Sequence, residues 1–164
     1  MNRYAEALAS IGQAAHARPD DTRPALLRGR MATDALRARL EPAAGDVFIA
    51  TFPKSGTTWM QQVACMLAGE GADVDIQTRA PYIEAAVATG AFNLSQLAAL
   101  KRPRIFKTHA AFAQLPVAGC APARPPEGVR VLLVVRDPRD VMVSLYYHSR
   151  AIRGIGYAEI AVCK

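Results

Sequence analysis

A short segment early in the chain combines a lysine with three hydroxyl residues between an apolar run and a helix-like pattern. The apolar run, residues 47–50, has the length and composition of a strand. Pro53 and Gly56 interrupt it, and residues 57–67 are predicted to form a helix that ends near Gly69. A helix that begins directly after a tight loop offers free N–H groups and the positive end of its dipole. Ammonium and hydroxyl groups are further donors to an anion. The segment therefore predicts a phosphate cradle that contains Lys54, Ser55, Thr57 and Thr58.

This pattern differs from the usual nucleotide-binding P-loop. In that loop four residues separate a first glycine from a Gly-Lys pair, and a serine or threonine follows the pair. Here Lys54 precedes Gly56, and no glycine opens the loop. The alternative is an ordinary strand, turn and helix with a solvated lysine. The complete run Thr-Phe-Pro-Lys-Ser-Gly-Thr-Thr-Trp, residues 51–59, favours a binding site over that alternative.

A second stretch places Lys107 and His109 after a short apolar pair, Ile105 and Phe106. A strand is predicted near residues 104–107. Open α/β sheets bind their ligands just beyond the carboxyl ends of their strands. Histidine titrates near neutral pH and is suited to general-base catalysis. A single histidine is more often structural, so its position after a strand is what favours a catalytic role.

A third stretch is a nearly continuous apolar run, residues 129–135, followed by Arg136. Such a run is typical of a strand that is covered on both faces of a parallel sheet. Pro138 prevents the strand from continuing, and Asp140 suits the first turn of a helix. Arg136 at the strand end and Ser144 two turns into that helix could both face one ligand.

Taken together, the three stretches resemble the motifs of the cytosolic-type sulfotransferases, which use 3′-phosphoadenosine 5′-phosphosulfate (PAPS). The run 51–59 is similar to their 5′-phosphosulfate-binding loop, and Lys-Thr-His at 107–109 is similar to the segment that carries their catalytic base. The run Arg-Asp-Pro-Arg-Asp-Val-Met-Val-Ser, residues 136–144, resembles their 3′-phosphate-binding motif. The resemblance covers residues 46 to 148.

This resemblance implies an enzyme that moves a sulfuryl group from PAPS to a hydroxyl or amine of a small-molecule acceptor. His109 would remove the acceptor proton, Lys54 would stabilise the bridging oxygen, and Lys107 would assist at the sulfuryl oxygens. The Pro-aromatic-aliphatic-Glu segment at 81–84 would place Pro81 and Tyr82 at the acceptor. No metal is implied. The residues implied in donor binding are Lys54, Ser55, Gly56, Thr57, Thr58, Trp59, Arg136 and Ser144.

Two departures from the family are visible. The family commonly continues with Leu-Pro after the histidine, whereas Ala110 and Ala111 follow His109 here, which affects the expected shape of the acceptor pocket. Family members also continue well beyond the position of Lys164. We therefore expect the sequence to correspond to the N-terminal part of a sulfotransferase domain, with little turnover by the 164-residue chain itself.

The expected fold is α/β: a P-loop-like, three-layer domain with a central parallel sheet, apparently truncated. The strand and helix patterns that carry the motifs begin near residue 46. We therefore expect a boundary there, with a helical N-terminal segment over 1–45 and the sulfotransferase part over 46–164. The net charge of +6 suits an anionic ligand and equally suits nucleic acid. Residues 23–39 carry five arginines without interleaved aromatic residues, so a solvated helix face is favoured over a nucleic-acid surface.

The three cysteines are widely spaced and predict neither a disulfide framework nor a zinc site. The sequence has neither an apolar run of membrane-spanning length nor a signal-peptide pattern, so a cytoplasmic protein is expected. Two other functions stay open: a P-loop kinase or NTPase, and a basic, non-enzymatic anion-binding protein. The first is disfavoured because Arg136 stands where an acidic magnesium ligand would end the strand. The sequence assigns neither the acceptor nor the oligomeric state.

Overall fold

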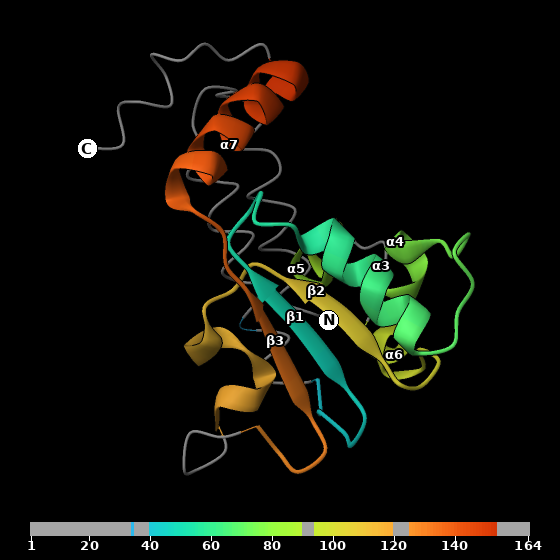
Figure 1. Ribbon diagram of the computed structural model, residues 1–164. Coiled ribbons are helices and arrows are strands. Elements are labelled where there is room, and N and C mark those ends of the chain that lie inside the picture. The colour runs from blue at the N-terminus through green and yellow to red at the C-terminus, as the bar shows by residue number, and fades with distance from the viewer. Residues whose placement is uncertain (1–33, 35–39, 90–93, 120–124, 154–164) are drawn as a thin grey trace.

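A computed structural model describes residue 34 and residues 40–89, 94–119 and 125–153 of the chain. Its centre is a three-stranded sheet in the order β2-β1-β3, made by β1 (Val47–Thr51), β2 (Ile105–Thr108) and β3 (Arg130–Val134) (Figure 1). Both pairings are parallel, with Val47 opposite Ile105 on one side and opposite Arg130 on the other. The predicted α/β fold and parallel sheet are confirmed, and each strand lies within one residue of its predicted bounds.

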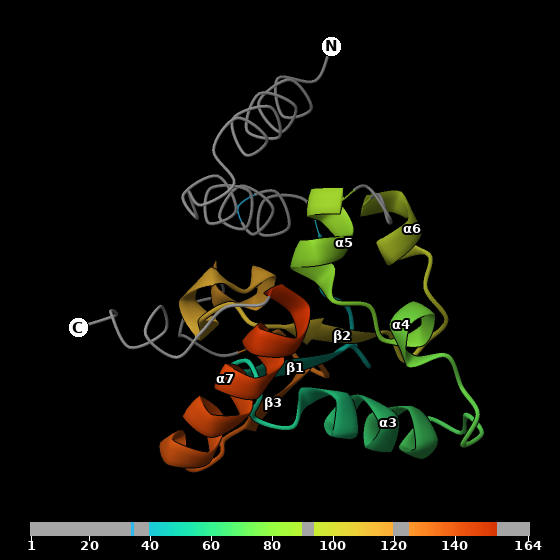
Figure 2. The same ribbon diagram turned by 90° about the horizontal axis from the view of Figure 1, so that it is seen from above.

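Helices cover the two faces of this sheet (Figure 2). On one face α3 (Thr57–Leu67) packs with α4 (Ile76–Arg79). The other face carries α5 (Ile83–Thr89), α6 (Leu94–Ala98) and two short 3₁₀ helices, η1 (Phe112–Gln114) and η2 (Pro116–Gly119). The last helix, α7 (Pro138–Arg153), follows β3 and extends beyond the carboxyl edge of the sheet. Helix α3 begins at the predicted residue, Thr57, and Asp140 lies in the first turn of α7 as expected.

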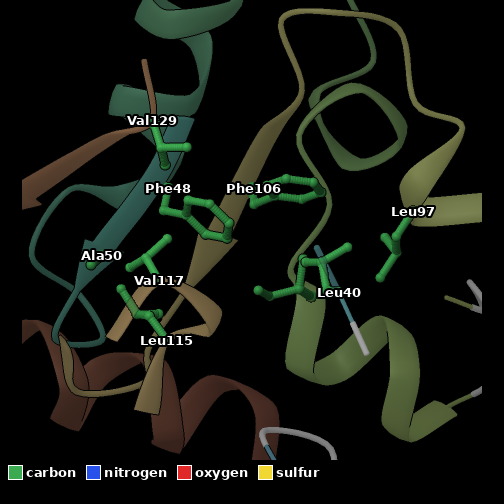
Figure 3. Packing of buried hydrophobic residues seen from close by; sticks show 9 residues of the cluster. Leu40, Phe48, Ala50, Leu97, Phe106, Leu115, Val117 and Val129 are labelled. Carbon is green, nitrogen blue, oxygen red and sulfur yellow. The ribbon is translucent and has the colours of Figure 1, made fainter. Parts of the chain in front are cut away.

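Alternate side chains of the strands fill two separate cores, as the two-residue period of a strand requires. The core beneath α5, α6 and the 3₁₀ helices contains Phe48 and Phe106, whose ring centroids are 5.0 Å apart (Figure 3). The core beneath α3 and α4 contains Ile49, Ile105 and Cys65. The central strand β1 therefore contributes to both cores, and its burial fixes the loop that follows it.

A buried ion pair joins the amino ends of β1 and β2. Arg104 Nε donates to the carboxylate of Asp46 at 2.8 Å, and a second guanidinium nitrogen donates to the other carboxylate oxygen. The backbone N–H of Ala43 donates to the same carboxylate at 2.8 Å, and Arg104 also donates to the carbonyl of Glu41 at 3.0 Å. Both side chains are buried, so the charges are matched by each other and by backbone groups.

The expectation that β3 is covered on both faces is wrong for the part of the chain that the structure describes. Leu133 is 73% exposed and Val135, just beyond the strand, is 77% exposed. Within the described ranges β3 pairs only with β1, and Leu132 and Val134 pack against the core beneath α3, whereas Leu133 on the opposite face stays exposed. The apolar composition of a strand indicates that its side chains are suited to burial. It does not reveal which elements of the fold cover them.

The expected helical segment 1–45 falls almost wholly outside the described residues. Of it, residues 40–45 form the turn that leads into β1, and Leu40 packs in the core beneath α5. Among the helices of the described residues, none combines the length and the apolar character that crossing a bilayer would need.

Candidate functional site

The loop between β1 and α3 has a backbone that leaves the first N–H groups of α3 unblocked. Lys54 has a φ of 66° and Gly56 a φ of 105°, both in the left-handed region, which glycine adopts without steric cost. The N–H of Ser55 donates to the carbonyl of Phe52 at 3.2 Å and closes the turn. Gly56 is the cap of α3 and has no side chain to accept from the helix. The free N–H groups of the first turn therefore remain available to an anion.

Most of the predicted donor-binding residues line one cavity of about 570 Å³ at the carboxyl edge of the sheet. They come from the β1–α3 loop, the first turn of α3, the end of β2 and the start of α7. From the prediction the cavity receives Lys54, Gly56, Thr57, Thr58, Trp59, Lys107, His109, Arg136 and Ser144. Five residues that were not predicted also line it: Pro53, Gln62, Ile76, Leu145 and His148. Ser55 is buried and is not among the lining residues.

Cationic groups gather around this cavity from three different strand ends. Lys54 follows β1, Lys107 lies in β2, and Arg136 follows β3. Arg136 is held at the rim, because one guanidinium nitrogen lies 3.4 Å from the carbonyl of Lys54 and another lies 3.5 Å from a carboxylate oxygen of Asp140. Trp59, in the first turn of α3, is 78% exposed and lines the cavity. The arrangement suits a polyanion that carries a flat aromatic ring.

The ring of His109 is fixed by the end of β1. Its Nδ1 lies 2.8 Å from the backbone carbonyl oxygen of Thr51. Since a carbonyl oxygen can only accept, Nδ1 carries a proton, and the neutral ring keeps Nε2 free to take one. Burial lowers the pKa of His109, the Thr51 carbonyl opposes that change, and the charge of Lys107 adds to it. The neutral form of the His109 ring, with Nε2 unprotonated, is therefore favoured.

Tyr82 packs between two of the three predicted catalytic side chains, those of Lys107 and His109. Lys107 Nζ lies 4.9 Å from the centroid of its ring, and the ring of His109 meets it edge-on at 4.9 Å. The backbone N–H of Lys107 donates to the carbonyl of Pro81 at 3.0 Å. Neither Pro81 nor Tyr82, predicted to contact the acceptor, lines either of the two cavities described for this site. Burial raises the pKa of the Tyr82 hydroxyl to about 12, so it stays protonated at neutral pH.

Glu84, on α5, holds the turn that carries His109. One of its carboxylate oxygens accepts from the hydroxyl of Thr108 and, at 3.1 Å, from the N–H of Ala110. Burial raises the pKa of Glu84, and the hydrogen bond from Thr108 opposes that change. Burial also lowers the pKa of Lys107; the carboxylate of Glu84 counteracts this effect and the charge of Lys54 strengthens it. The charged form of Lys107 is therefore less favoured here than it is in water.

A second cavity, of about 470 Å³, opens on the other side of His109. Thr51 and His109 are its polar lining residues. The remaining lining is apolar: Ala50, Phe52, Ala110, Ala111, Phe112, Val131 and Leu133. His109 thus lines both cavities. Sequence reasoning missed the walls of this second cavity. They come from three segments, residues 50–52, 109–112 and 131–133, and no local pattern indicates that these segments meet.

We expect His109 to titrate below pH 6.5, the ordinary value for histidine, because burial disfavours its charged form. The unfolded chain then takes up a proton first as the pH falls. The contribution of His109 to stability is therefore complete above about pH 6.5 and is lost as the pH falls towards the folded pKa. An NMR titration of the imidazole resonances, assigned with His109→Gln, measures the midpoint. A midpoint at or above 6.5 would contradict the expected desolvation.

Comparison with known proteins defines the class. The family model for the sulfotransferase domain matches residues 44–160, and the chain belongs to this family. It is 39% identical over 110 residues to sulfotransferase 2B1 of Homo sapiens, an alignment that covers 64% of this chain and 27% of that protein. To sulfotransferase 1C2 of Homo sapiens it is 36% identical over 111 residues, which cover 64% of this chain and 36% of that protein. The chain thus spans only about a quarter to a third of the length of these relatives.

The fold also matches a solved structure. A crystal structure of retinol dehydratase in a complex with retinol and PAP aligns with a TM-score of 0.54 and 22% sequence identity. The alignment covers 74% of this chain and 44% of that one. At this identity the match establishes a shared fold, in agreement with the family assignment.

Proposed function

We propose that this chain carries the donor site and the catalytic base of a sulfotransferase that moves a sulfuryl group from PAPS to a small apolar acceptor. The single observation that carries this proposal is the position of His109 between two cavities of different chemistry. One is surrounded by Lys54, Lys107 and Arg136, and the other is lined mainly by apolar side chains. A base between an anion site and an apolar site suits transfer from a charged donor to an apolar alcohol.

We call the cavity surrounded by Lys54, Lys107 and Arg136 the donor cavity, and all the predicted donor-binding residues except the buried Ser55 line it. The N–H groups at the start of α3, with Ser55, Thr57 and Thr58, would hold the 5′-phosphate, and Lys54 would lie at the bridging oxygen. Arg136 and Ser144 would hold the 3′-phosphate, and Trp59 would lie against the adenine. Arg136 and Ser144 approach from the β3–α7 junction, whereas the others approach from the β1–α3 loop. The two phosphates would therefore be held by separate elements.

The transfer step resembles phosphoryl transfer, in which the protein contributes mostly positioning and charge stabilisation. His109 Nε2 would take the proton of the acceptor hydroxyl as its oxygen forms a bond to sulfur. The bond from sulfur to the bridging oxygen would break, and adenosine 3′,5′-bisphosphate would leave. Lys54 and Lys107 would stabilise the charge that develops on the bridging and sulfuryl oxygens. A neutral His109 with its proton on Nδ1 is in the correct state to begin this step.

The acceptor class follows from the second cavity. Its walls include Phe52, Phe112 and Leu133, and its polar side chains, those of Thr51 and the neutral His109, carry no charge. An apolar molecule that presents one hydroxyl to His109 fits this chemistry, and a charged acceptor does not. The complex of retinol dehydratase with retinol and PAP pairs an apolar alcohol with a nucleotide on the same fold, which supports this choice.

Donor binding can be tested on the chain as it stands. We expect adenosine 3′,5′-bisphosphate to raise the melting temperature, and ATP with Mg²⁺ or a short DNA duplex to have a much smaller effect. The shift should persist in EDTA, because none of the proposed contacts involves a metal. A larger shift with ATP and Mg²⁺ that EDTA abolishes would instead support a kinase or NTPase, and a preference for DNA would support a basic binding protein.

We expect Arg136→Ala to weaken binding of adenosine 3′,5′-bisphosphate by about 10- to 100-fold, the usual cost of a lost hydrogen bond to a charged group. Binding of adenosine 5′-phosphosulfate, which has no 3′-phosphate, should change little. Arg130→Ala removes the same charge at the amino end of β3, away from the cavity, and serves as the matched control. Isothermal titration calorimetry measures all the constants. Equal losses for the two nucleotides would remove Arg136 from the 3′-phosphate site.

A further inference from the structure

Thr51, the last residue of β1, contacts His109 and also Thr57, which lines the donor cavity. Its backbone carbonyl accepts from His109 Nδ1 at 2.8 Å, and its hydroxyl oxygen lies 3.2 Å from the same nitrogen. That hydroxyl is also 2.5 Å from the hydroxyl of Thr57. Thr51 is only 4% exposed and does not line the donor cavity, whereas Thr57 does. A continuous chain of polar groups therefore runs from the donor cavity through Thr57 and Thr51 to the base.

The chemistry of the three groups determines which group donates each hydrogen bond in this chain of polar groups. The carbonyl contact fixes the proton of the neutral ring on Nδ1, so the Thr51 hydroxyl oxygen accepts from His109. The Thr51 proton is then free to be donated to Thr57. Thr57 accepts that bond and has its own proton left to donate into the cavity. An anion in the cavity would take that proton as a hydrogen bond and would favour the same direction throughout.

We propose that Thr51 is a positioning residue: through this hydroxyl chain, an anion bound in the donor cavity influences which nitrogen of the His109 ring carries the proton. When an anion accepts from Thr57, the aligned chain favours the His109 tautomer with the proton on Nδ1 and keeps Nε2 free. The base is then prepared when the donor is in place. The chain of hydroxyls stands on the contacts alone, and the identity of the anion as the 5′-phosphate of the donor rests on the proposed function.

The first test uses the chain without ligand and reads the tautomer from the ¹⁵N shifts of the His109 ring above its pKa. Thr51→Val keeps the carbonyl and the side-chain shape but removes the hydroxyl. It should lower the ratio of the Nδ1–H to the Nε2–H tautomer by about 3- to 10-fold, the range for one neutral hydrogen bond. Thr51→Ser keeps the hydroxyl and should restore the ratio to within about twofold. A role in packing alone predicts the opposite ranking, because valine fills the site and serine does not.

The second test asks whether Thr57 acts through Thr51. Thr57→Val should lower the tautomer ratio although Thr57 does not touch the ring, and the double variant should fall no further than Thr51→Val alone. Thr58→Val is the matched control, because Thr58 lines the same cavity but lies outside the hydroxyl chain. Additive effects of the two variants, or an equal effect of Thr58→Val, would overturn the relay. Thermal melting of each variant confirms that it is folded, and alanine replaces valine where it is not.

The third test adds adenosine 3′,5′-bisphosphate. In the unmodified chain the ligand should raise the Nδ1–H population, and in Thr51→Val that response should be reduced at least about threefold while the nucleotide still binds. Binding with the same response in both proteins would overturn the proposal. If the nucleotide does not bind the unmodified chain, the proposed function fails, and the ligand-free variants still decide whether the relay exists.

Discussion

Replacing His109 with alanine is expected to lower the rate of sulfuryl transfer from PAPS by about 10²–10⁴-fold, the usual contribution of a general base. Affinity for adenosine 3′,5′-bisphosphate should change little, because His109 lies at the boundary of the donor cavity and its ring is held by Thr51. The measurement is a single-turnover assay with labelled PAPS, an apolar alcohol and the protein in excess, so that even a slow rate can be quantified.

The matched control for this prediction is His148→Ala. His148 lies on α7, lines the donor cavity and is exposed, but it does not line the apolar cavity. Its replacement should leave the single-turnover rate within about the same order of magnitude, since it is not placed to accept the acceptor proton. A comparable loss in both variants, or an unchanged rate in His109→Ala, would exclude His109 as the base.

The second large effect is expected at the opposite edge of the sheet. Asp46→Ala should lower the free energy of unfolding by about 3–5 kcal/mol, because it leaves the guanidinium of Arg104 buried without its partner. It also removes the acceptor of the Ala43 N–H. Urea denaturation, followed by the fluorescence of Trp59 and by circular dichroism, measures the change. The loss should concern stability alone, because both residues lie far along the strands from the donor cavity.

Two further variants separate the ion pair from general damage. The double variant Asp46→Leu with Arg104→Met replaces both charges with apolar groups and should recover most of the loss. Arg102→Ala removes an exposed charge that lies 3.9 Å from the same carboxylate, and it should cost no more than about 1 kcal/mol. If Asp46→Ala costs as little as Arg102→Ala, the buried pair does not join the strands as described.

The sequence was sufficient for the sheet and for the edge that carries the site. Lys54, His109 and Arg136 each follow a segment that was predicted to form a strand, and the carboxyl ends of parallel strands lie at one edge. Their convergence on one cavity follows from that rule and was predicted. The start of α3 was also predictable. Pro53 and Gly56 interrupt the strand pattern, and the helical pattern begins directly after Gly56.

Features that depend on side-chain contacts between distant segments were not predictable. Nothing in the local pattern around Thr51 indicates that its carbonyl fixes the ring of His109. The same holds for Tyr82, because the local pattern does not indicate that its ring packs between Lys107 and His109. Helix α4 was missed because its four residues are too few for a periodic pattern, although Asp75 accepts from the N–H of Gln77 as a recognisable cap.

The position of β1 in the centre of the sheet also has a consequence during synthesis. Val47 pairs with Arg130, and a ribosome that adds about 5–20 residues per second needs roughly 4–17 s to make the chain between them. Over that interval β1 at first has no neighbouring strand and, once Thr108 has been made, can pair with β2 on one side only, while Ile49 lacks part of its apolar surroundings. The nascent protein therefore carries an unpaired, apolar strand for several seconds, long enough for a chaperone to bind it before β3 arrives.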